Sequence, residues 1–373
     1  MREWNNPQGF SDICNNNICG NLRGNCLRLI QKTMKLPPSA VLELTYQCNH
    51  KCKFCSCPWF APNGDYPVGQ ELDLYQWKQI ISRLYDSGIE TISISGGECL
   101  LKDCLKDVIL HINQESKKHG KRKEIVLISN GLLMSEDYLR FFKQYHVHLS
   151  MSLPGIETFK EHTGVDNADG VLHWFQEAKK LGMNTTVNVT VTKKNYFELF
   201  KTISMGLISG ASSVLVNRFL PGGRGLLHQN ELLLDRKQLN GMLDTTEEVL
   251  LLSNRYGQAG TEIPLCAIDS PEKYRRLGYG TKCSAAKDFF VIDPAGKIRT
   301  CNHSPRVVGD VFDKDMIKDK AYWSVFANCN YHPMRCQTCK SIELCDCGCR
   351  EVANILYHSP CAVDDSCGSD LLN

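Results

Sequence analysis

The chain has 373 residues, of which 42% are hydrophobic, so it can bury a sizeable core and form one large domain plus a smaller one. Lys and Arg number 43 against 41 Asp and Glu, and the net charge of +2 gives no field that would favour nucleic acid or an anionic membrane as partner. The N-terminus lacks the basic start and apolar run of a signal peptide, and no stretch is long and apolar enough to span a bilayer. We therefore expect a cytoplasmic protein.

The middle of the chain alternates apolar, β-branched runs with amphipathic segments, which indicates repeated βα units and a parallel sheet. The expected strands lie at 40–46, 91–96, 124–131, 147–153, 185–191 and 213–219. The expected helices lie between them, near 72–87, 103–118, 135–145, 168–182 and 195–209. Six strands in this order predict an α/β fold, an open or closed partial (β/α)6 TIM-like barrel whose active site lies at the carboxyl ends of the strands.

A longer amphipathic stretch at 234–257 predicts a helix that links this core to a cysteine-rich C-terminal region. We place the domain boundaries around that helix. The expected organisation is an N-terminal extension (1–38), the barrel (39–233), the linking helix (234–260) and a small C-terminal domain (261–373).

Twenty cysteines are the anomaly of the composition. Cytosolic thiols are kept reduced, so a disulfide framework would not persist there, and metal ligation is the natural explanation. Three cysteines lie in 14–26, four in 48–57, two in 99–104 and eleven from 266 onward. We therefore predict two metal-binding regions, one before and one after a middle part of the chain that has no cysteine.

The first region has the spacing Cys48-x3-Cys52-x2-Cys55, directly after the first expected strand. One loop at the mouth of the barrel would thus carry three thiolates, which suit iron–sulfur clusters and zinc. Three cysteines around a four-iron cluster leave one iron open for a small molecule. Cys57 offers the alternative of a fourth ligand, which would give a closed site.

This spacing resembles the signature of the radical S-adenosylmethionine (SAM) superfamily, with Phe54 in the usual aromatic place before the third cysteine. The resemblance implies that the amino and carboxylate groups of SAM bind the open iron. An electron from the cluster would then cleave SAM to methionine and a 5′-deoxyadenosyl radical, which abstracts hydrogen from the substrate.

Further residues of the family pattern follow the expected strands. Gly96-Gly97-Glu98 matches the motif that holds the methionine amino group of SAM; two glycines allow close backbone approach and a carboxylate pairs with an ammonium. By the same resemblance, SAM is contacted by Phe54 of the cysteine loop. Residues of the later strands and their ends add further contacts, namely Ser129, Asn130, Ser150, Ser152, Asn188 and Arg218, the arginine as a carboxylate partner. Taken singly, each of these has the alternative of an ordinary turn or surface residue.

The C-terminal cysteines resemble the SPASM domain, an extension of some radical SAM enzymes that carries two auxiliary iron–sulfur clusters. The resemblance implies that Cys283, Cys301 and Cys349 hold the first cluster, and Cys336, Cys339, Cys345 and Cys367 the second. Cys361 is the alternative to Cys367. Cys266 is the candidate fourth ligand of the first cluster; without it, that cluster has an open iron. A pair of zinc knuckles is the alternative for the whole region.

The other cysteines match no family pattern. Cys14, Cys19 and Cys26 could in principle hold another metal, and we interpret Cys57, Cys99, Cys104, Cys329 and Cys347 as structural, because free cysteines often act as small buried hydrophobes.

Together the resemblances imply SAM, three 4Fe-4S clusters, anaerobic work and a reducing electron donor such as flavodoxin or ferredoxin. They favour modification of a peptide or protein, by crosslinking, oxidation or epimerisation, as in ribosomally made precursors. Asn302 and His303 follow Cys301 where sulfatase-maturing members usually carry an acidic residue, which argues against that subfamily. The alternatives are a small-molecule radical SAM dehydrogenase and a non-enzymatic zinc-binding module.

Recognition of a leader peptide is a separate question. Many peptide-modifying members carry an N-terminal winged-helix module, whereas about forty residues precede the first expected strand, short of an ordinary domain. We therefore expect either that a partner supplies leader recognition or that the substrate is not such a peptide. The sequence identifies no catalytic acid or base.

Overall fold

The computed structural model describes residues 36–120 and 124–366, and the described residues from Pro37 onward form one compact unit. The candidate cysteines Cys14, Cys19, Cys26 and Cys367 lie outside the described residues. Within that described part of the chain, no helix has both the length and the apolar character needed to cross a bilayer.

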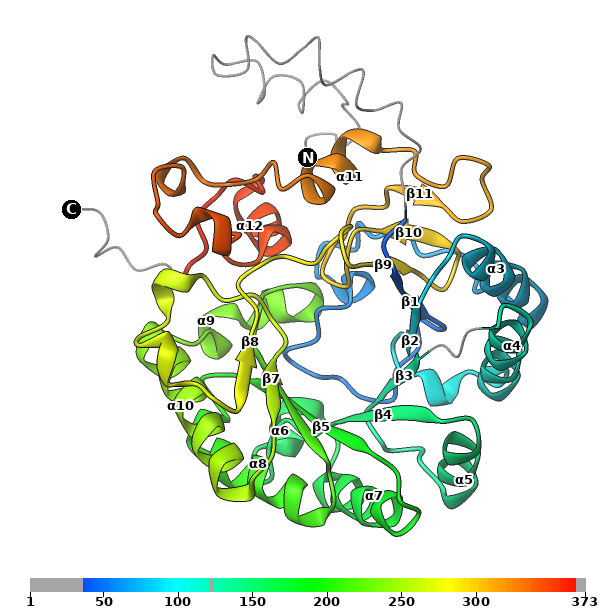
Figure 1. The fold of residues 1–373 in the computed structure, drawn as a ribbon, viewed down its shortest axis with the longest axis horizontal. Helices are drawn as coiled ribbons and strands as arrows, with labels where there is room; N and C mark the ends of the chain where they lie inside the picture. The colour runs from blue at the N-terminus through cyan, green and yellow to red at the C-terminus, as the bar shows by residue number, and fades with distance from the viewer. Residues whose placement is uncertain (1–35, 121–123, 367–373) are drawn as a thin grey trace. The chain divides into compact units, whose positions relative to one another are not determined.

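A single 11-stranded sheet curves through the unit (Figure 1) in the order β11-β10-β9-β1-β2-β3-β4-β5-β6-β7-β8. The predicted strands are β1 (Ser39–Glu43), β2 (Thr91–Ser95), β3 (Glu124–Ser129), β4 (Val147–Ser152), β5 (Thr185–Val191) and β6 (Ser213–Arg218). All six pair in parallel with their neighbours, which confirms the predicted α/β barrel core. β1 ends earlier than the predicted strand end at Tyr46, because the Tyr46 backbone N–H donates to the Glu71 carboxylate and not to a neighbouring strand.

Helices surround the outer face of the sheet in Figure 1. The predicted ones are α3 (Leu74–Asp86), α4 (Leu105–Lys118), α5 (Glu136–Gln144), α7 (Ala168–Lys180), α8 (Leu199–Ser209) and α10 (Arg236–Ser253). The further ones are α6 (Phe159–Thr163), α9 (Gln229–Leu232), α11 (Lys320–Ala327) and α12 (Arg350–Tyr357). In α3, a capping box of Asp73 and Gln76 starts the helix, and its apolar stripe, which includes Trp77 and Ile80, is buried.

Alternation along the strands separates the core from the barrel interior. In β5, Val187, Val189 and Val191 are buried, whereas the half-buried Asn188 and Thr190 line an internal cavity. Because successive side chains of a strand point to opposite faces, the valines face the helix layer and the polar residues face inward. The two-residue period of TTVNVTV therefore builds the core and lines the cavity at once.

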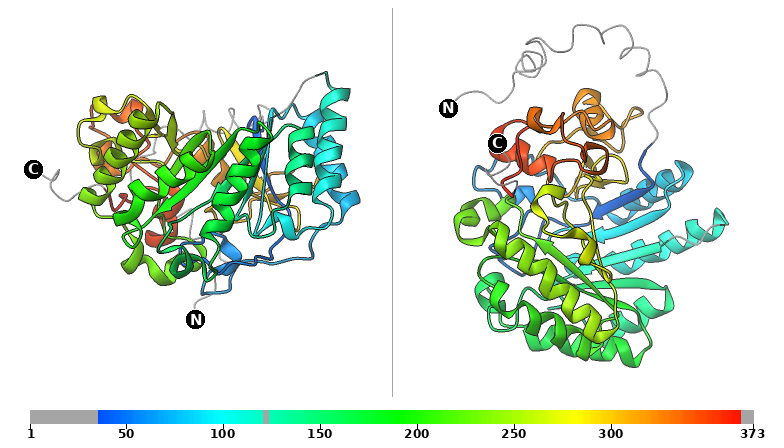
Figure 2. Two further views of the ribbon diagram at one scale, coloured as in Figure 1. Left: turned by 90° about the horizontal axis from the view of Figure 1, so that it is seen from below. Right: turned by 60° about the vertical axis from the view of Figure 1, so that its left-hand side comes forward.

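The sheet continues beyond the six predicted strands. β7 (Gly257–Ala259) and β8 (Leu277–Tyr279) extend it past β6, and α10 packs on both (Figure 2). At the other edge, β9 (Phe289–Ile292) pairs in parallel with β1, followed by the antiparallel β10 (Lys297–Arg299) and β11 (Gly309–Asp310). The cysteine-rich region therefore shares the sheet of the barrel, while the boundaries at 233 and 260 stay a prediction.

A buried ion pair joins the two regions. Glu43 ends β1 and Arg299 ends β10; they are 2% and 0% exposed, and their side chains form a salt bridge. Burial raises the pKa of Glu43, and the arginine opposes that shift. The Arg299 guanidinium also donates to the carbonyl oxygens of Cys301, Asn302 and Ser304 at 3.3, 3.1 and 2.9 Å. Arg299 thus holds the loop after β10 against the end of β1.

Glu43→Gln should lower the free energy of unfolding by about 3 kcal/mol, because Arg299 would keep its charge in a buried site without the counter-ion. Urea denaturation of the metal-free protein, followed by circular dichroism, measures the change. Asp269→Asn is the matched control: it breaks the exposed Arg236–Asp269 pair, also a salt bridge (2.8 Å), and should cost less than about 1 kcal/mol. Equal small losses in both variants would contradict the structural role of the buried pair.

Candidate active site

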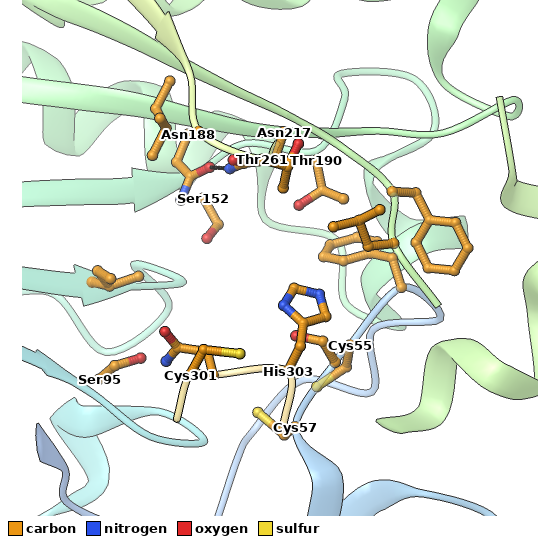
Figure 3. Close-up of a pocket in the computed structure, with 18 of the residues that line it drawn as sticks. Cys55, Cys57, Ser95, Ser152, Asn188, Thr190, Asn217, Thr261, Cys301 and His303 are labelled. Carbon is orange, nitrogen blue, oxygen red and sulfur yellow. Dashed lines mark hydrogen bonds between the residues drawn. The ribbon is translucent and has the colours of Figure 1, made fainter. Parts of the chain in front are cut away.

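A cavity of about 740 Å³ opens at the carboxyl ends of the barrel strands (Figure 3). The last residues of four strands line it, namely Ser95 of β2, Ser129 of β3, Ser152 of β4 and Arg218 of β6. Its volume falls in the range of about 300–1,000 Å³ that is common for ligand pockets. The cavity therefore lies where the barrel topology places an active site.

The loop after β1 brings Cys48, Cys52 and Cys55 to the cavity wall. Backbone hydrogen bonds fasten it on two sides: Lys53 N–H donates to the His162 oxygen at 2.8 Å, and Gly225 N–H donates to the Cys55 oxygen at 3.1 Å. Burial raises the pKa of Cys48 and of Cys52. Because metals bind thiolates, cluster insertion here must release protons.

Cys57 stands directly beside Cys55. A hydrogen bond from the Cys57 thiol lowers the pKa of Cys55, and the Cys57 sulfur lies 3.8 Å from the Gly96 carbonyl oxygen. Figure 3 shows both thiols on the same side of the cavity. The alternative of Cys57 as a fourth ligand therefore remains open on geometry.

Gly96 and Gly97 pack against the backbone of the cysteine loop. Gly97 N–H donates to the Thr45 oxygen at 2.8 Å, and a β-carbon added at Gly97 would lie 2.0 Å from the Gln47 oxygen. Gly96 has a φ of +137°, and its added β-carbon would lie 2.8 Å from the Thr45 oxygen. These two positions require glycine because the ends of β1 and β2 touch there.

Glu98 links the ends of β2 and β3. Its Oε1 accepts hydrogen bonds from Ser129 Oγ at 2.8 Å and Leu100 N at 3.1 Å, and its Oε2 accepts one from Asn130 N at 2.8 Å. Burial raises the pKa of Glu98, although these hydrogen bonds oppose the shift. Each carboxylate oxygen has two lone pairs, so Oε2 keeps one beyond its bond to Asn130 among the described residues.

The remaining predicted SAM contacts divide into two groups. Phe54, Asn130, Ser152 and Asn188 line the cavity, and Asn130 also donates to Asn49 Oδ1 at 2.7 Å on the cysteine loop. Ser150 is not among the lining residues: it is 4% exposed, deeper along β4, and its hydroxyl has no hydrogen-bond partner within the described chain. By the two-residue period Ser150 lies on the same face of β4 as Ser152, but it does not line the cavity.

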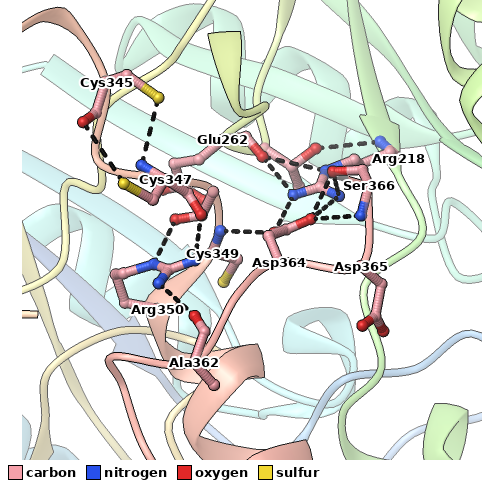
Figure 4. A network of polar contacts seen from close by, with 12 residues as sticks. Arg218, Glu262, Cys345, Cys347, Cys349, Arg350, Ala362, Asp364, Asp365 and Ser366 are labelled. Atoms are coloured by element: carbon pink, nitrogen blue, oxygen red, sulfur yellow. Dashed lines mark hydrogen bonds and ion pairs between the residues drawn. The ribbon is translucent and has the colours of Figure 1, made fainter. Parts of the chain in front are cut away.

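Arg218 lines the cavity, yet its guanidinium is engaged by protein groups (Figure 4). Nη1 and Nη2 donate to the two carboxylate oxygens of Asp364 at 3.0 and 2.8 Å, and Nε donates to the Glu262 carbonyl oxygen at 3.0 Å. Nη1 also donates to Ser366 Oγ at 3.1 Å. The sequence prediction of a SAM carboxylate partner remains untested, and the structure gives this arginine a carboxylate of its own.

Cys283, Cys301 and Cys349 line the same cavity as the first three cysteines. Burial raises the pKa of each thiol, and Cys349 adds to the shift at the other two. The structure thus brings together the three thiols predicted for the first auxiliary cluster. Cys266 is absent from the cavity lining. Within residues 36–120 and 124–366, no three His, Cys, Asp or Glu side chains converge as a site for a single metal ion.

Cys347 is a residue that the sequence analysis interpreted as structural. Its thiol hydrogen-bonds to Cys345 and Cys336, two predicted ligands of the second cluster, and the contact lowers the pKa of Cys345 to about 6. The run CDCGC at 345–349 was the available signal. Cys339, the other described thiol of that set, is exposed.

His303 lines the cavity, and sequence reasoning did not assign it to the site. Figure 3 shows its ring pointing into the cavity, between Cys301 and the pair Cys55 and Cys57. Burial, together with the nearby Arg299, lowers the pKa of His303 to about 4, so the ring is neutral near pH 7. A neutral imidazole can both donate and accept a hydrogen bond. Its position two residues after Cys301 was the signal in the sequence.

The chain is similar to known proteins in sequence and in fold. The sequence model of the Radical SAM superfamily matches residues 42–204. A PqqA peptide cyclase of Granulibacter bethesdensis is 23% identical over 348 residues, which cover 90% of this chain and 88% of that protein.

Two crystal structures of Streptococcus suis SuiB share the fold. The form bound to S-adenosylmethionine gives a TM-score of 0.69 at 18% identity and covers 93% of this chain and 81% of SuiB. The form bound to the precursor peptide SuiA gives a TM-score of 0.68 at 17% identity, with 98% and 82% covered.

Gly97→Ala should lower the rate of 5′-deoxyadenosine formation from SAM about a hundredfold, because the new β-carbon forces the cysteine loop away from β2 by about an ångström. Liquid chromatography of anaerobic reactions with dithionite measures the product. Gly88→Ala is the control, because a β-carbon added there meets open space. The positive φ of Gly88 adds strain of about 1–2 kcal/mol, but the rate should stay within about twofold because no neighbour is displaced. Equal rates in the two variants would show that the close approach at Gly97 is not needed.

Proposed function

Because this chain belongs to the radical SAM superfamily, we propose that it is an enzyme that uses SAM radical chemistry to modify a peptide substrate. The carrying observation is that Cys48, Cys52 and Cys55 face one cavity together with the polar ends of β2 to β6. A four-iron cluster on these thiols would supply the electron that cleaves SAM.

The protein's own groups are placed to orient SAM. Glu98 lines the cavity and keeps acceptor capacity on Oε2 beyond its bond to Asn130, so it could stabilise an ammonium group there by a charge-assisted hydrogen bond. Gly96 and Gly97 bring the backbone of the β2 end close to the cysteine loop. Phe54, Ser152 and Asn188 provide the remaining proposed contacts on the cavity wall.

A first auxiliary cluster on Cys283, Cys301 and Cys349 is the second part of the proposal. These thiols line the cavity that would hold SAM, so a cluster there could take the second electron of an oxidative reaction. Cys266 is the proposed fourth ligand, and without it that cluster would have an open iron. We assign a second cluster to Cys336, Cys339, Cys345 and Cys367, with Cys347 as a candidate ligand in addition.

A peptide is favoured over a small molecule as substrate because of the relatives. The PqqA peptide cyclase matches along 90% of this chain, and SuiB, which has the same fold, was crystallised with its precursor peptide. A small-molecule dehydrogenase is the second candidate, and an electron donor such as flavodoxin or ferredoxin is required by either. The alternative of a non-enzymatic zinc module is not retained, because the family match indicates an enzyme.

Anaerobic incubation with SAM, dithionite and peptides encoded by neighbouring short reading frames tests the substrate class. Mass spectrometry should show a peptide that has lost two hydrogens, as crosslinking or dehydrogenation requires. Epimerisation would instead leave the mass unchanged in ordinary water and raise it in deuterated water by the exchange of a hydrogen for a deuterium. If the peptides stay unchanged while a small metabolite is turned over, the peptide proposal is wrong and the small-molecule dehydrogenase is the function.

Cys52→Ala should abolish formation of 5′-deoxyadenosine and leave the C-terminal clusters in place, because it removes one of three ligands of the SAM-binding cluster. Cys57→Ala, on the same loop, is the matched control and should keep the activity within about threefold, since an open iron is what SAM needs. Product assays and iron analysis are made on both proteins. Equal loss of activity in the two variants would establish Cys57 as a fourth ligand and contradict the open site.

A further inference from the structure

Arg218 and Asp364 form a buried ion pair between the barrel and the C-terminal cysteine segment (Figure 4). Their side chains are 8% and 4% exposed, and both terminal guanidinium nitrogens bond to the carboxylate, at 3.0 and 2.8 Å. Arg218 is the last residue of β6, whereas Asp364 lies beyond α12. The pair therefore connects a cavity wall to a segment 146 residues further along the chain.

Asp364 passes this connection on to Cys349. Its Oδ2 accepts a hydrogen bond from Cys349 N at 3.1 Å as well as from Arg218. Gly348 has a φ of +85°, and a β-carbon added there would lie 2.2 Å from the same oxygen. The Asp364 carboxylate therefore fills space next to Cys349 that any side chain larger than hydrogen at position 348 would occupy.

Arg350 fixes the same turn from its other side. It is fully buried, and its guanidinium donates to the carbonyl oxygens of Gly348, Pro360 and Ala362 at 3.0, 3.1 and 2.8 Å. It also contacts the carbonyl oxygen of Cys347. The backbone around Cys349 is thus held by two buried arginines, one directly and one through Asp364.

We propose that Arg218 and Asp364 are positioning residues that set the place of the Cys349 thiol on the cavity wall, and that Arg218 does not bind SAM. The inference rests on the proposed auxiliary cluster and names the residues that align one of its ligands with the SAM site. Its physical basis is that every guanidinium nitrogen of Arg218 already has a partner from the chain. A ligand carboxylate would have to displace Asp364.

Three variants separate this role from SAM binding. Asp364→Ala and Arg218→Met each remove one partner and leave the other charge buried and unpaired, which destabilises the fold. The double variant Arg218→Met with Asp364→Leu removes both charges and so avoids this destabilisation. Arg236→Gln is the control, because it breaks an exposed Arg–Asp pair of 2.8 Å elsewhere. The measurements are iron per chain, SAM affinity by equilibrium dialysis, and alkylation of individual thiols in metal-free protein by mass spectrometry.

In metal-free protein, Cys349 should be alkylated about tenfold faster in Asp364→Ala and in the double variant than in wild type, because a buried thiol is inert until its segment moves. Cys99, buried in the barrel, should not change. In reconstituted protein, iron should fall by about four atoms from about twelve per chain. The dissociation constant for SAM should stay within about twofold.

SAM binding that weakens about tenfold, with iron content and Cys349 alkylation unchanged, would overturn the inference and make Arg218 a SAM ligand. If alkylation of Cys349 and of Cys99 accelerated equally, the inference would also be overturned, because the variant would then have lost the whole fold. If single variants are insoluble, the double variant decides by the same criteria. A wild-type protein with about four irons would refute the auxiliary clusters, whereas unchanged alkylation in the variants would refute the positioning role by itself.

Discussion

The salt bridge between Glu43 and Arg299 is the interaction on which the arrangement of the site depends. It crosses 256 residues of sequence and closes the carboxyl end of β1 onto that of β10. The loop with Cys48 leaves β1 just after Glu43, and Cys301 follows Arg299 by two residues. Two cysteine groups far apart in the chain therefore share one cavity.

The parallel pairing of β9 with β1 makes this closure possible. It occupies the edge of the first strand, which a half-barrel would otherwise leave open, and it aligns Ala40 with Phe290 in the sheet core. Buried polar residues then satisfy one another across the joint, as in the hydrogen bonds of Tyr46 and Tyr66 to Asp293 at 3.0 and 2.7 Å. The C-terminal region is thus built into the barrel wall.

The local patterns were sufficient to predict the barrel strands and the first cysteine group. Alternation of apolar and polar residues, as in 185–191, depends on neighbours two positions apart, and the spacing of Cys48, Cys52 and Cys55 lies within one loop. The GGE turn was also visible, although its steric reason, contact with the backbone of Thr45 and Gln47, became clear only in three dimensions.

Features that rest on distant contacts could not be predicted in the same way. β7 and β8 have three residues each, too few for a periodic signal. Arg218 at a strand end looks the same whether it meets a ligand or Asp364, because the partner lies 146 residues away. His303 likewise lines the cavity from a loop whose carbonyl oxygens, at Asn302 and Ser304, accept hydrogen bonds from Arg299, a contact that its sequence neighbours do not reveal.

Both cysteine groups line one cavity, and Figure 3 shows the ring of His303 between Cys301 and Cys55. In the proposed function, a cluster on the first group would start an oxidation and a cluster on the second group would accept its second electron. Anomalous diffraction at the iron edge from crystals of the anaerobically reconstituted protein measures this arrangement most directly. We predict two iron clusters bordering one cavity, on Cys48, Cys52 and Cys55 and on Cys283, Cys301 and Cys349; zinc in their place, or iron on the first group alone, would contradict it.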